Sequence, residues 1–174
     1  MGAESLLESV RCAAVDTSPF IYLFEARPPR QDRAVELFAR LESARLVTSI
    51  ITIIEVFTNC QREGRQDLRL QYMSFFHETP GLEVIGVEWA VAERAAEIRS
   101  RYRLRVPDAV QIATGIVEKA EILITMIDGS WRSLKFRLSC STTGRHSVRP
   151  AGYGLPGVSA GAGAGRTIWL RVSR

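Results

Sequence analysis

Short apolar runs that alternate with longer amphipathic segments are the feature that most constrains the fold of this chain. The apolar runs lie at residues 13–15, 46–48, 82–87 and 122–125. Each run has the length of a buried strand, and the segments between them carry apolar residues at helical spacing. Strands that alternate with helices predict a mostly parallel sheet covered by helices on both faces. We therefore expect an α/β fold.

Amphipathic patterns place the helices between these runs. One helix begins after Asp16, where Thr17 and Pro19 suit a cap and a first turn, and two consecutive prolines end it. Further helices are predicted at residues 31–43, 66–78 and 89–102, from Ser49 or Thr52 to Gly64, and from Pro107 onward. The last run is followed by an expected loop at residues 128–131.

The composition of the chain changes beyond Phe136. Residues 139–165 are rich in Ser, Gly and Pro, a composition that buries little apolar surface and predicts a flexible segment. We therefore expect one domain at residues 11–136 and a Gly/Ser-rich tail at residues 137–174. A short strand could form near the end of this tail, at residues 168–170.

The net charge of +4 is unevenly distributed along the chain. Eight of the 23 Lys and Arg residues, and none of the 19 Asp and Glu residues, follow Asp128. A basic flank beside acidic residues suits a protein that attracts a polyanion and holds a divalent cation. A tail that only aids solubility explains the same distribution equally well.

Several classes of protein are excluded by the residues of the chain. Glu4 and Glu8 stand where a secretory signal would have its basic start, and no apolar run has the length of a membrane span. The three cysteines are too far apart for a zinc knuckle or a disulfide framework, and the two histidines lie in segments with no other catalytic pattern. We expect a cytoplasmic protein with no membrane association, whose chemistry rests on carboxylates.

Four acidic residues stand out by their positions. Asp16 follows the first apolar run, Glu55 is a lone acid in an apolar helix, Asp108 lies in the first turn of a helix, and Asp128 follows the last run. A charge such as that of Glu55 is costly in an apolar helix unless it is paired, bound to metal or at the edge of the apolar face, whereas Asp16 could simply cap its helix. Carboxylates that are brought together stay ionised when a cation compensates them, and oxygen ligands favour Mg²⁺ or Mn²⁺.

The residues around these acids match a known family. The matching segments are Val15-Asp16-Thr17-Ser18-Pro19-Phe20-Ile21-Tyr22, Thr48-Ser49 with Glu55-Val56, Pro107-Asp108-Ala109-Val110-Gln111-Ile112-Ala113, and Leu123-Ile124-Thr125 with Asp128. In this order they resemble a PIN domain and, within that family, the VapC-type ribonuclease toxins of toxin–antitoxin pairs. The resemblance covers about residues 13–136. It implies a small three-layer α/β/α sandwich around a short, mostly parallel sheet.

The resemblance also implies an activity and a site. The expected activity is endonucleolytic cleavage of RNA that depends on Mg²⁺ or Mn²⁺, by a homodimer that a small antitoxin neutralises. The implied acidic site consists of Asp16, Glu55, Asp108 and Asp128, with Asp16, Asp108 and Asp128 as metal ligands and Thr17 and Thr125 as supporting hydroxyls. Arg103, Arg105 and Arg132 are expected to bind the RNA backbone, although the first two could equally form a solvated basic face.

One departure from the family pattern leaves other functions open. The last family motif usually runs Thr-Asn-Asp, whereas Met126 and Ile127 separate Thr125 from Asp128 here. One alternative is therefore a non-catalytic PIN-like module that binds nucleic acid or protein. A phosphatase with an aspartyl nucleophile is a further alternative, but such an enzyme usually has an acid two residues after the first, where this chain has Ser18.

Overall fold

The structure is a computed structural model that describes residues 9–127, 130–136 and 168–171 of the 174-residue chain, with the main chain alone from residue 127 onward. Within these ranges, six strands form one sheet in the order β3-β2-β1-β4-β5-β6. The strands are β1 Cys12–Val15, β2 Arg45–Ser49, β3 Leu82–Ile85, β4 Ile122–Ile127, β5 Ser130–Phe136 and β6 Ile168–Arg171. The first four are parallel to one another, and β5 and β6 each pair antiparallel with the preceding strand.

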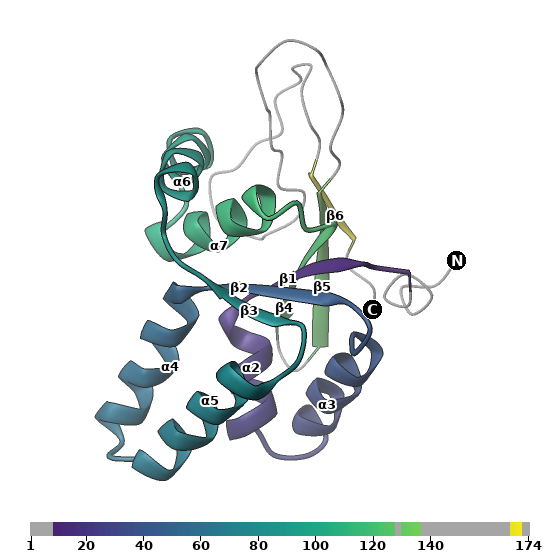
Figure 1. The fold of residues 1–174 in the computed structure, drawn as a ribbon, viewed down its shortest axis with the longest axis vertical. Coiled ribbons are helices and arrows are strands. Elements are labelled where there is room, and N and C mark those ends of the chain that lie inside the picture. Colours follow the sequence, from purple (N-terminus) through teal and green to yellow (C-terminus); the bar gives the residue numbers. More distant parts are fainter. Residues whose placement is uncertain (1–8, 128–129, 137–167, 172–174) are drawn as a thin grey trace.

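Helices cover the two faces of this sheet. They are α2 Thr17–Glu25, α3 Arg30–Arg40, α4 Ile50–Arg62, α5 Gln66–Glu78, α6 Trp89–Tyr102 and α7 Val106–Val117. Figure 1 shows α2, α3, α4 and α5 on one face and α6 and α7 on the other, so the α/β sandwich with a mostly parallel sheet is confirmed. None of the helices in the described ranges has the length and apolar character needed to cross a membrane.

Two different cores hold the layers together. On the side of α2 to α5, Phe20 is completely buried and its ring lies 5.4 Å from Phe38 and 4.9 Å from Phe76, measured between centroids. On the other side, small residues such as Ala95 and Ala113 let α6 and α7 pack closely on the sheet. Aromatic rings therefore contribute much of the first core, whereas alanines and aliphatic side chains make up most of the second.

Strand β1 lies at the centre of the parallel strands and positions the residue that follows it. Ala14 pairs with Val47 of β2 on one side and with Leu123 of β4 on the other. The main-chain N–H of Asp16 continues the ladder and donates to the carbonyl of Ile124 at 2.8 Å. Asp16 is therefore fixed at the carboxyl edge of the sheet, the edge at which open α/β folds bind ligands.

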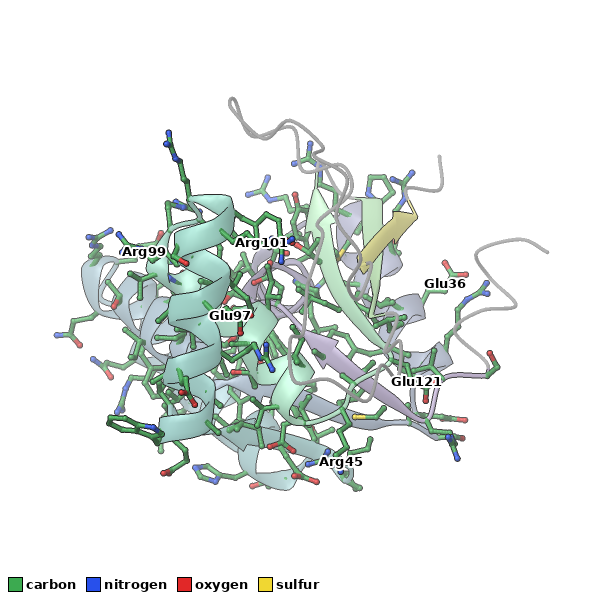
Figure 2. All side chains as sticks on the ribbon, turned by 90° about the horizontal axis from the view of Figure 1, so that it is seen from above. Glu36, Arg45, Glu97, Arg99, Arg101 and Glu121 are labelled. Carbon is green, nitrogen blue, oxygen red and sulfur yellow. The ribbon has the colours of Figure 1, made fainter. Side chains whose placement is uncertain are left out.

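The opposite edge of the sheet is neutralised by ion pairs. Arg45, which is labelled in Figure 2, lies at the start of β2. It donates to Glu83 and Glu118, and each of the two N···O distances from its Nη2 atom is 2.7 Å. These hydrogen bonds raise the pKa of Arg45 above its ordinary value. The amino edge of the sheet thus carries acids that a guanidinium already compensates.

The sequence-based boundaries agree with the structure in most places. The helices predicted at residues 66–78 and 89–102 have these bounds, and Ser49 caps α4, since its Oγ accepts from the main-chain N–H of Ile51 at 3.2 Å. The loop expected at residues 128–131 is wrong in part, because β5 already begins at Ser130 and its hydrogen bonds to β4 extend the sheet there. The strand expected near the end of the tail is present as β6.

Two expectations for the C-terminal part stay predictions. The boundary between a domain at residues 11–136 and a tail at residues 137–174 is not tested by the pairing of β6 with β5. The flexible segment expected at residues 139–165 lies outside the described residues.

Substitution of Phe20 tests the aromatic core. Phe20→Ala should lower the free energy of unfolding by about 3 to 5 kcal/mol, because it removes a fully buried ring and leaves a cavity. Urea unfolding followed by circular dichroism measures the change. Leu70→Ala, at an α5 side chain that is 62% exposed, is the control and should change stability by less than about 0.5 kcal/mol. Equal losses for both variants would contradict the assignment of this core.

Candidate active site

Asp16 occupies the N-cap position of α2 but does not act as a cap. Its carboxylate makes no capping hydrogen bond to the helix. Instead, Oδ2 accepts a hydrogen bond from the Thr125 hydroxyl of β4 at 2.8 Å, and the Ser18 hydroxyl lies 3.4 Å from the same oxygen. The half-buried carboxylate is thus held by the Thr125 hydroxyl of β4 and by two groups in the first turn of α2, the Ser18 hydroxyl and the main-chain N–H of Thr17.

Ser18 is a residue of this site that the sequence did not single out. Its Oγ accepts from the main-chain N–H of Met126 at 2.8 Å and lies 2.9 Å from Thr125 Oγ1. Because Thr125 donates its proton to Asp16, Ser18 is the donor to Thr125. The supporting hydroxyl predicted at Thr125 therefore contacts Asp16 directly, and Ser18 orients it.

Glu55 comes to the same edge from α4. The hydroxyl of Thr17 donates a short hydrogen bond to Oε2 of Glu55. Thr17 directly follows Asp16 in the chain, so this bond brings the second acid close to the first. Among the described residues, the hydrogen-bond partner of the Glu55 carboxylate is thus a hydroxyl.

Asp108 lies in the first turn of α7 and is engaged by Arg105. The Nε atom of Arg105 donates to Oδ2 at 3.0 Å and Nη2 donates to Oδ1 at 3.4 Å. The Arg105 side chain is 85% exposed and that of Asp108 is 39% exposed, so water screens the pair and its contribution to stability is small. This ion pair is one that a competing cation or phosphate can replace.

The electrostatics of the site are dominated by Asp16. Burial raises the pKa of Asp16 above its ordinary value of 3.8, and the nearby carboxylates of Glu55 and Asp108 raise it further. The hydrogen bond from Thr125 opposes these effects. The carboxyl edge of the sheet therefore gathers negative charge in a half-buried place, and a cation would relieve it.

The candidate ligands at this edge, the carboxylates of Asp16, Glu55 and Asp108, offer only oxygen atoms. Oxygen is the ligand atom that a hard divalent ion prefers. Their present arrangement is open: in the described part of the chain, no three His, Cys, Asp or Glu side chains are grouped closely enough to hold a metal ion. Asp128, the fourth acid of the predicted site, lies outside the described residues. The structure thus brings together Asp16, Glu55 and Asp108 as neighbours whose charges act on one another.

A buried polar network behind the acids was not predicted. Gln111 of α7 donates from Nε2 to Thr52 Oγ1 of α4 at 2.7 Å and to Thr17 Oγ1 at 3.3 Å. Its Oε1 accepts from the main-chain N–H of Ser49 at 3.3 Å. The signal in the sequence was the same as for Glu55, namely one polar residue in an otherwise apolar stretch of helix.

Arginines line the approach from the α6–α7 turn. Arg103 and Arg105 are exposed there, and Figure 2 shows Arg99 and Arg101 in the preceding last turn of α6. Of these four arginines, Arg105 is hydrogen-bonded to Asp108. Arg132 lies on β5, where the main chain alone is described.

Comparison with known proteins gives one family and a set of similar folds. The family model of the PIN domain matches residues 13–129. A search of curated proteins finds no match. A toxin–antitoxin complex from Klebsiella pneumoniae contains a chain with 28% sequence identity and a TM-score of 0.50, covering 65% of this chain and 84% of that chain.

Two further solved structures are similar in fold. Mycobacterium tuberculosis VapC20, a sarcin-ricin loop cleaving toxin, has 20% identity and a TM-score of 0.56, covering 67% of this chain and 90% of that chain. VapBC2 from Rickettsia felis, bound to a fragment of promoter DNA, has 17% identity and a TM-score of 0.50, covering 63% and 83%. At these identities the likeness concerns the fold alone.

The raised pKa of Asp16 predicts how stability depends on pH in EDTA. The folded protein binds this proton more tightly than the unfolded chain does, so the stabilisation is complete below pH 3.8 and is lost as the pH rises through the raised pKa. Asp16→Asn should weaken this dependence and be more stable than the wild type at neutral pH. Urea unfolding at a series of pH values measures it, with exposed Asp67→Asn as the control. A parallel pH profile for wild type and Asp16→Asn would refute the assignment.

Proposed function

Because this chain belongs to the PIN domain family, we propose that it is a divalent-metal-dependent endoribonuclease and the toxin of a toxin–antitoxin pair. PIN nucleases generally use divalent metal ions. The observation that supports the proposal most is Asp16, a half-buried carboxylate at the end of the central strand, whose pKa is raised by burial and by two further acids. A protein has little reason to collect these charges unless a cation and a phosphate are to be bound there.

The proposed roles follow from the positions of the acids. Asp16 and Asp108 would hold Mg²⁺ or Mn²⁺, with Asp128 as a third ligand. Bound there, such an ion supplies the Lewis acidity that activates water and stabilises the charge developing on a phosphodiester. Thr125 keeps Asp16 oriented, and Thr17 does the same for Glu55, which would accept a hydrogen bond from the attacking water.

Arg105 has two roles in this proposal. In the structure, its guanidinium engages the Asp108 carboxylate. If Asp108 held the ion, this guanidinium would be available to the RNA backbone, where Arg103 and Arg132 would also bind phosphates. An exposed and screened ion pair suits this exchange, because little stability is lost when it opens.

The proposed partners are RNA, a cognate antitoxin and a second copy of this chain. The antitoxin is supported by the complex from Klebsiella pneumoniae, the most similar in sequence of the structures described above. A homodimer is supported by apolar side chains that gather on α4, where Ile53, Ile54 and Phe57 line an open hollow and Ile54 is exposed. Burial of such side chains is a common driving force of association.

A non-catalytic PIN-like binding module is the second candidate. The observation that favours it is the open arrangement of the acids in the described residues, together with the shifted position of Asp128 in its motif. The two candidates differ in whether RNA is cut when metal is present.

Metal-dependent cleavage is the direct test. Purified protein should cleave a mixed RNA pool with Mg²⁺ or Mn²⁺ and lose this activity in EDTA. Asp16→Asn and Asp108→Asn should each lower the rate by at least about 100-fold, because each removes a proposed ligand of the ion. Cleavage products resolved by gel electrophoresis measure the rate, and circular dichroism verifies folding.

A control variant and one negative result complete this test. Asp67→Asn, on the exposed surface of α5, should cleave at the wild-type rate. Asp128→Asn would tell whether the displaced acid serves the reaction. A folded, antitoxin-free protein that binds no metal and cuts no RNA would favour the binding module instead.

The proposed phosphate contact of Arg103 predicts a salt effect. Arg103→Gln should weaken RNA binding and reduce the slope of log K against log salt by about 0.7, the value for one contact to a single strand. Lys119→Gln is a matched control, since Lys119 is exposed, has a left-handed φ of 59° like the 53° of Arg103, and lies at the opposite edge of the sheet. Fluorescence anisotropy in EDTA measures both slopes. If the two variants changed the slope equally, the contact would be non-specific.

A further inference from the structure

Gln111 is a buried amide whose orientation the structure determines. Its side chain is only 4% exposed, in a helix whose neighbouring residues are apolar. Its Oε1 atom faces the main-chain N–H of Ser49, and an N–H can only donate. The oxygen must therefore point to Ser49, and the two Nε2 protons point to Thr52 and Thr17.

The hydroxyl of Thr48 fixes the direction of the next bond. Thr48 Oγ1 lies 2.8 Å from the carbonyl oxygen of Val15, which can only accept, so Thr48 donates its single proton there. The contact of 2.8 Å between Thr48 and Thr52 is then a donation from Thr52. With its proton used in this way, Thr52 acts toward Gln111 as an acceptor.

The Thr17 hydroxyl has two acceptors within reach, Thr52 Oγ1 at 3.2 Å and the Glu55 carboxylate, and the contact with Glu55 is the shorter. Its oxygen accepts from Gln111 at 3.3 Å, and the proton of Thr52 is already directed to Thr48. The proton of Thr17 is therefore free for the Glu55 carboxylate. Through Thr17, the donors point from Gln111 toward Glu55, whereas the branch through Thr52 and Thr48 ends at the carbonyl of Val15.

We propose that Gln111 is a positioning residue for Glu55: its buried amide directs the Thr17 hydroxyl to donate to the Glu55 carboxylate and so holds this acid in its working orientation. Thr52 supports the arrangement by fixing the amide. The inference rests on the nuclease function proposed above, but it assigns a role to residues that touch neither metal nor substrate. If the hydrogen bonds of Gln111 only held α7 against α4, they would stabilise the fold without affecting turnover.

Two substitutions distinguish the hydrogen-bond direction that Gln111 imposes from the packing of its side chain. Gln111→Met keeps the length of the side chain and removes both donors. Gln111→Glu keeps the shape but replaces the donors with acceptors, so that the Thr17 hydroxyl turns away from Glu55. Each should lower kcat on an RNA oligonucleotide by about 10- to 100-fold, the range seen when residues that orient site groups are changed, with KM within about twofold.

Thr114→Val is the matched control. Thr114 lies on the same helix, is 1% exposed, and its hydroxyl has no hydrogen-bond partner among the described residues. This variant removes a buried hydroxyl outside the path to Glu55, so kcat should equal that of the wild type. Thermal unfolding in EDTA verifies that each variant is folded, and calorimetric titration with Mn²⁺ gives a readout that is independent of turnover. Gln111→Met should bind Mn²⁺ as tightly as Thr114→Val does, because Glu55 is not among the proposed ligands of the ion.

Substitutions of Thr52 provide an independent pair if neither Gln111 variant folds. Thr52→Ser keeps the hydroxyl and should retain kcat, whereas Thr52→Val removes it and should lower kcat by a smaller factor than the changes at Gln111, because the bond from Gln111 to Thr17 remains.

The outcomes that overturn the inference are distinct from those that overturn the function. Folded Gln111 variants with wild-type kcat, or a loss of kcat in Thr114→Val as large as theirs, would refute the positioning role while the nuclease stands. For the Thr52 pair, equal kcat values for Ser and Val would do the same. A wild-type protein that neither cleaves RNA nor binds Mn²⁺ would refute the proposed function, and the inference would fall with it.

Discussion

Repulsion between carboxylates at the end of the central strand is the constraint on which the rest of the site depends. Asp16 is half-buried there, and the charges of Glu55 and Asp108 disfavour its ionised form. Hydroxyl groups donate hydrogen bonds to two of these carboxylates: Thr125 donates to Asp16 and Thr17 donates to Glu55. Hydroxyls orient the acids without neutralising them, so the negative charge remains available to a cation.

The amino and carboxyl edges of the sheet differ in how their acidic side chains are paired. At the amino edge, Arg45 forms ion pairs with Glu83 and Glu118, so these acids already have a cationic partner. At the carboxyl edge, Arg105 reaches Asp108 from solvent and forms a pair that water screens. Parallel strands make this asymmetry possible, because all four of them end at one edge, where the helices that follow β1, β2 and β3 begin.

Much of this architecture could be predicted from the sequence, for reasons that particular residues make clear. The pattern at residues 66–78 and 89–102 gives two helices with correct bounds, because their apolar periodicity is local. Glu55 was recognisable as an acid in an apolar helix. Gln111 met the same criterion and was overlooked, and β5 was in part assigned to a loop because its formation depends on hydrogen bonds to β4.

The sequence by itself determined the alternation of strands and helices and singled out the candidate acids, since both depend on the residues of short stretches of chain. Only the tertiary structure decided that Thr17, 35 residues before Thr52 and 94 before Gln111, lies within hydrogen-bond reach of both. The direction of those bonds depends on which neighbours can only donate and which can only accept. Such neighbours are brought together by packing of α2, α4 and α7 on the sheet, and no local pattern specifies distances between segments so far apart.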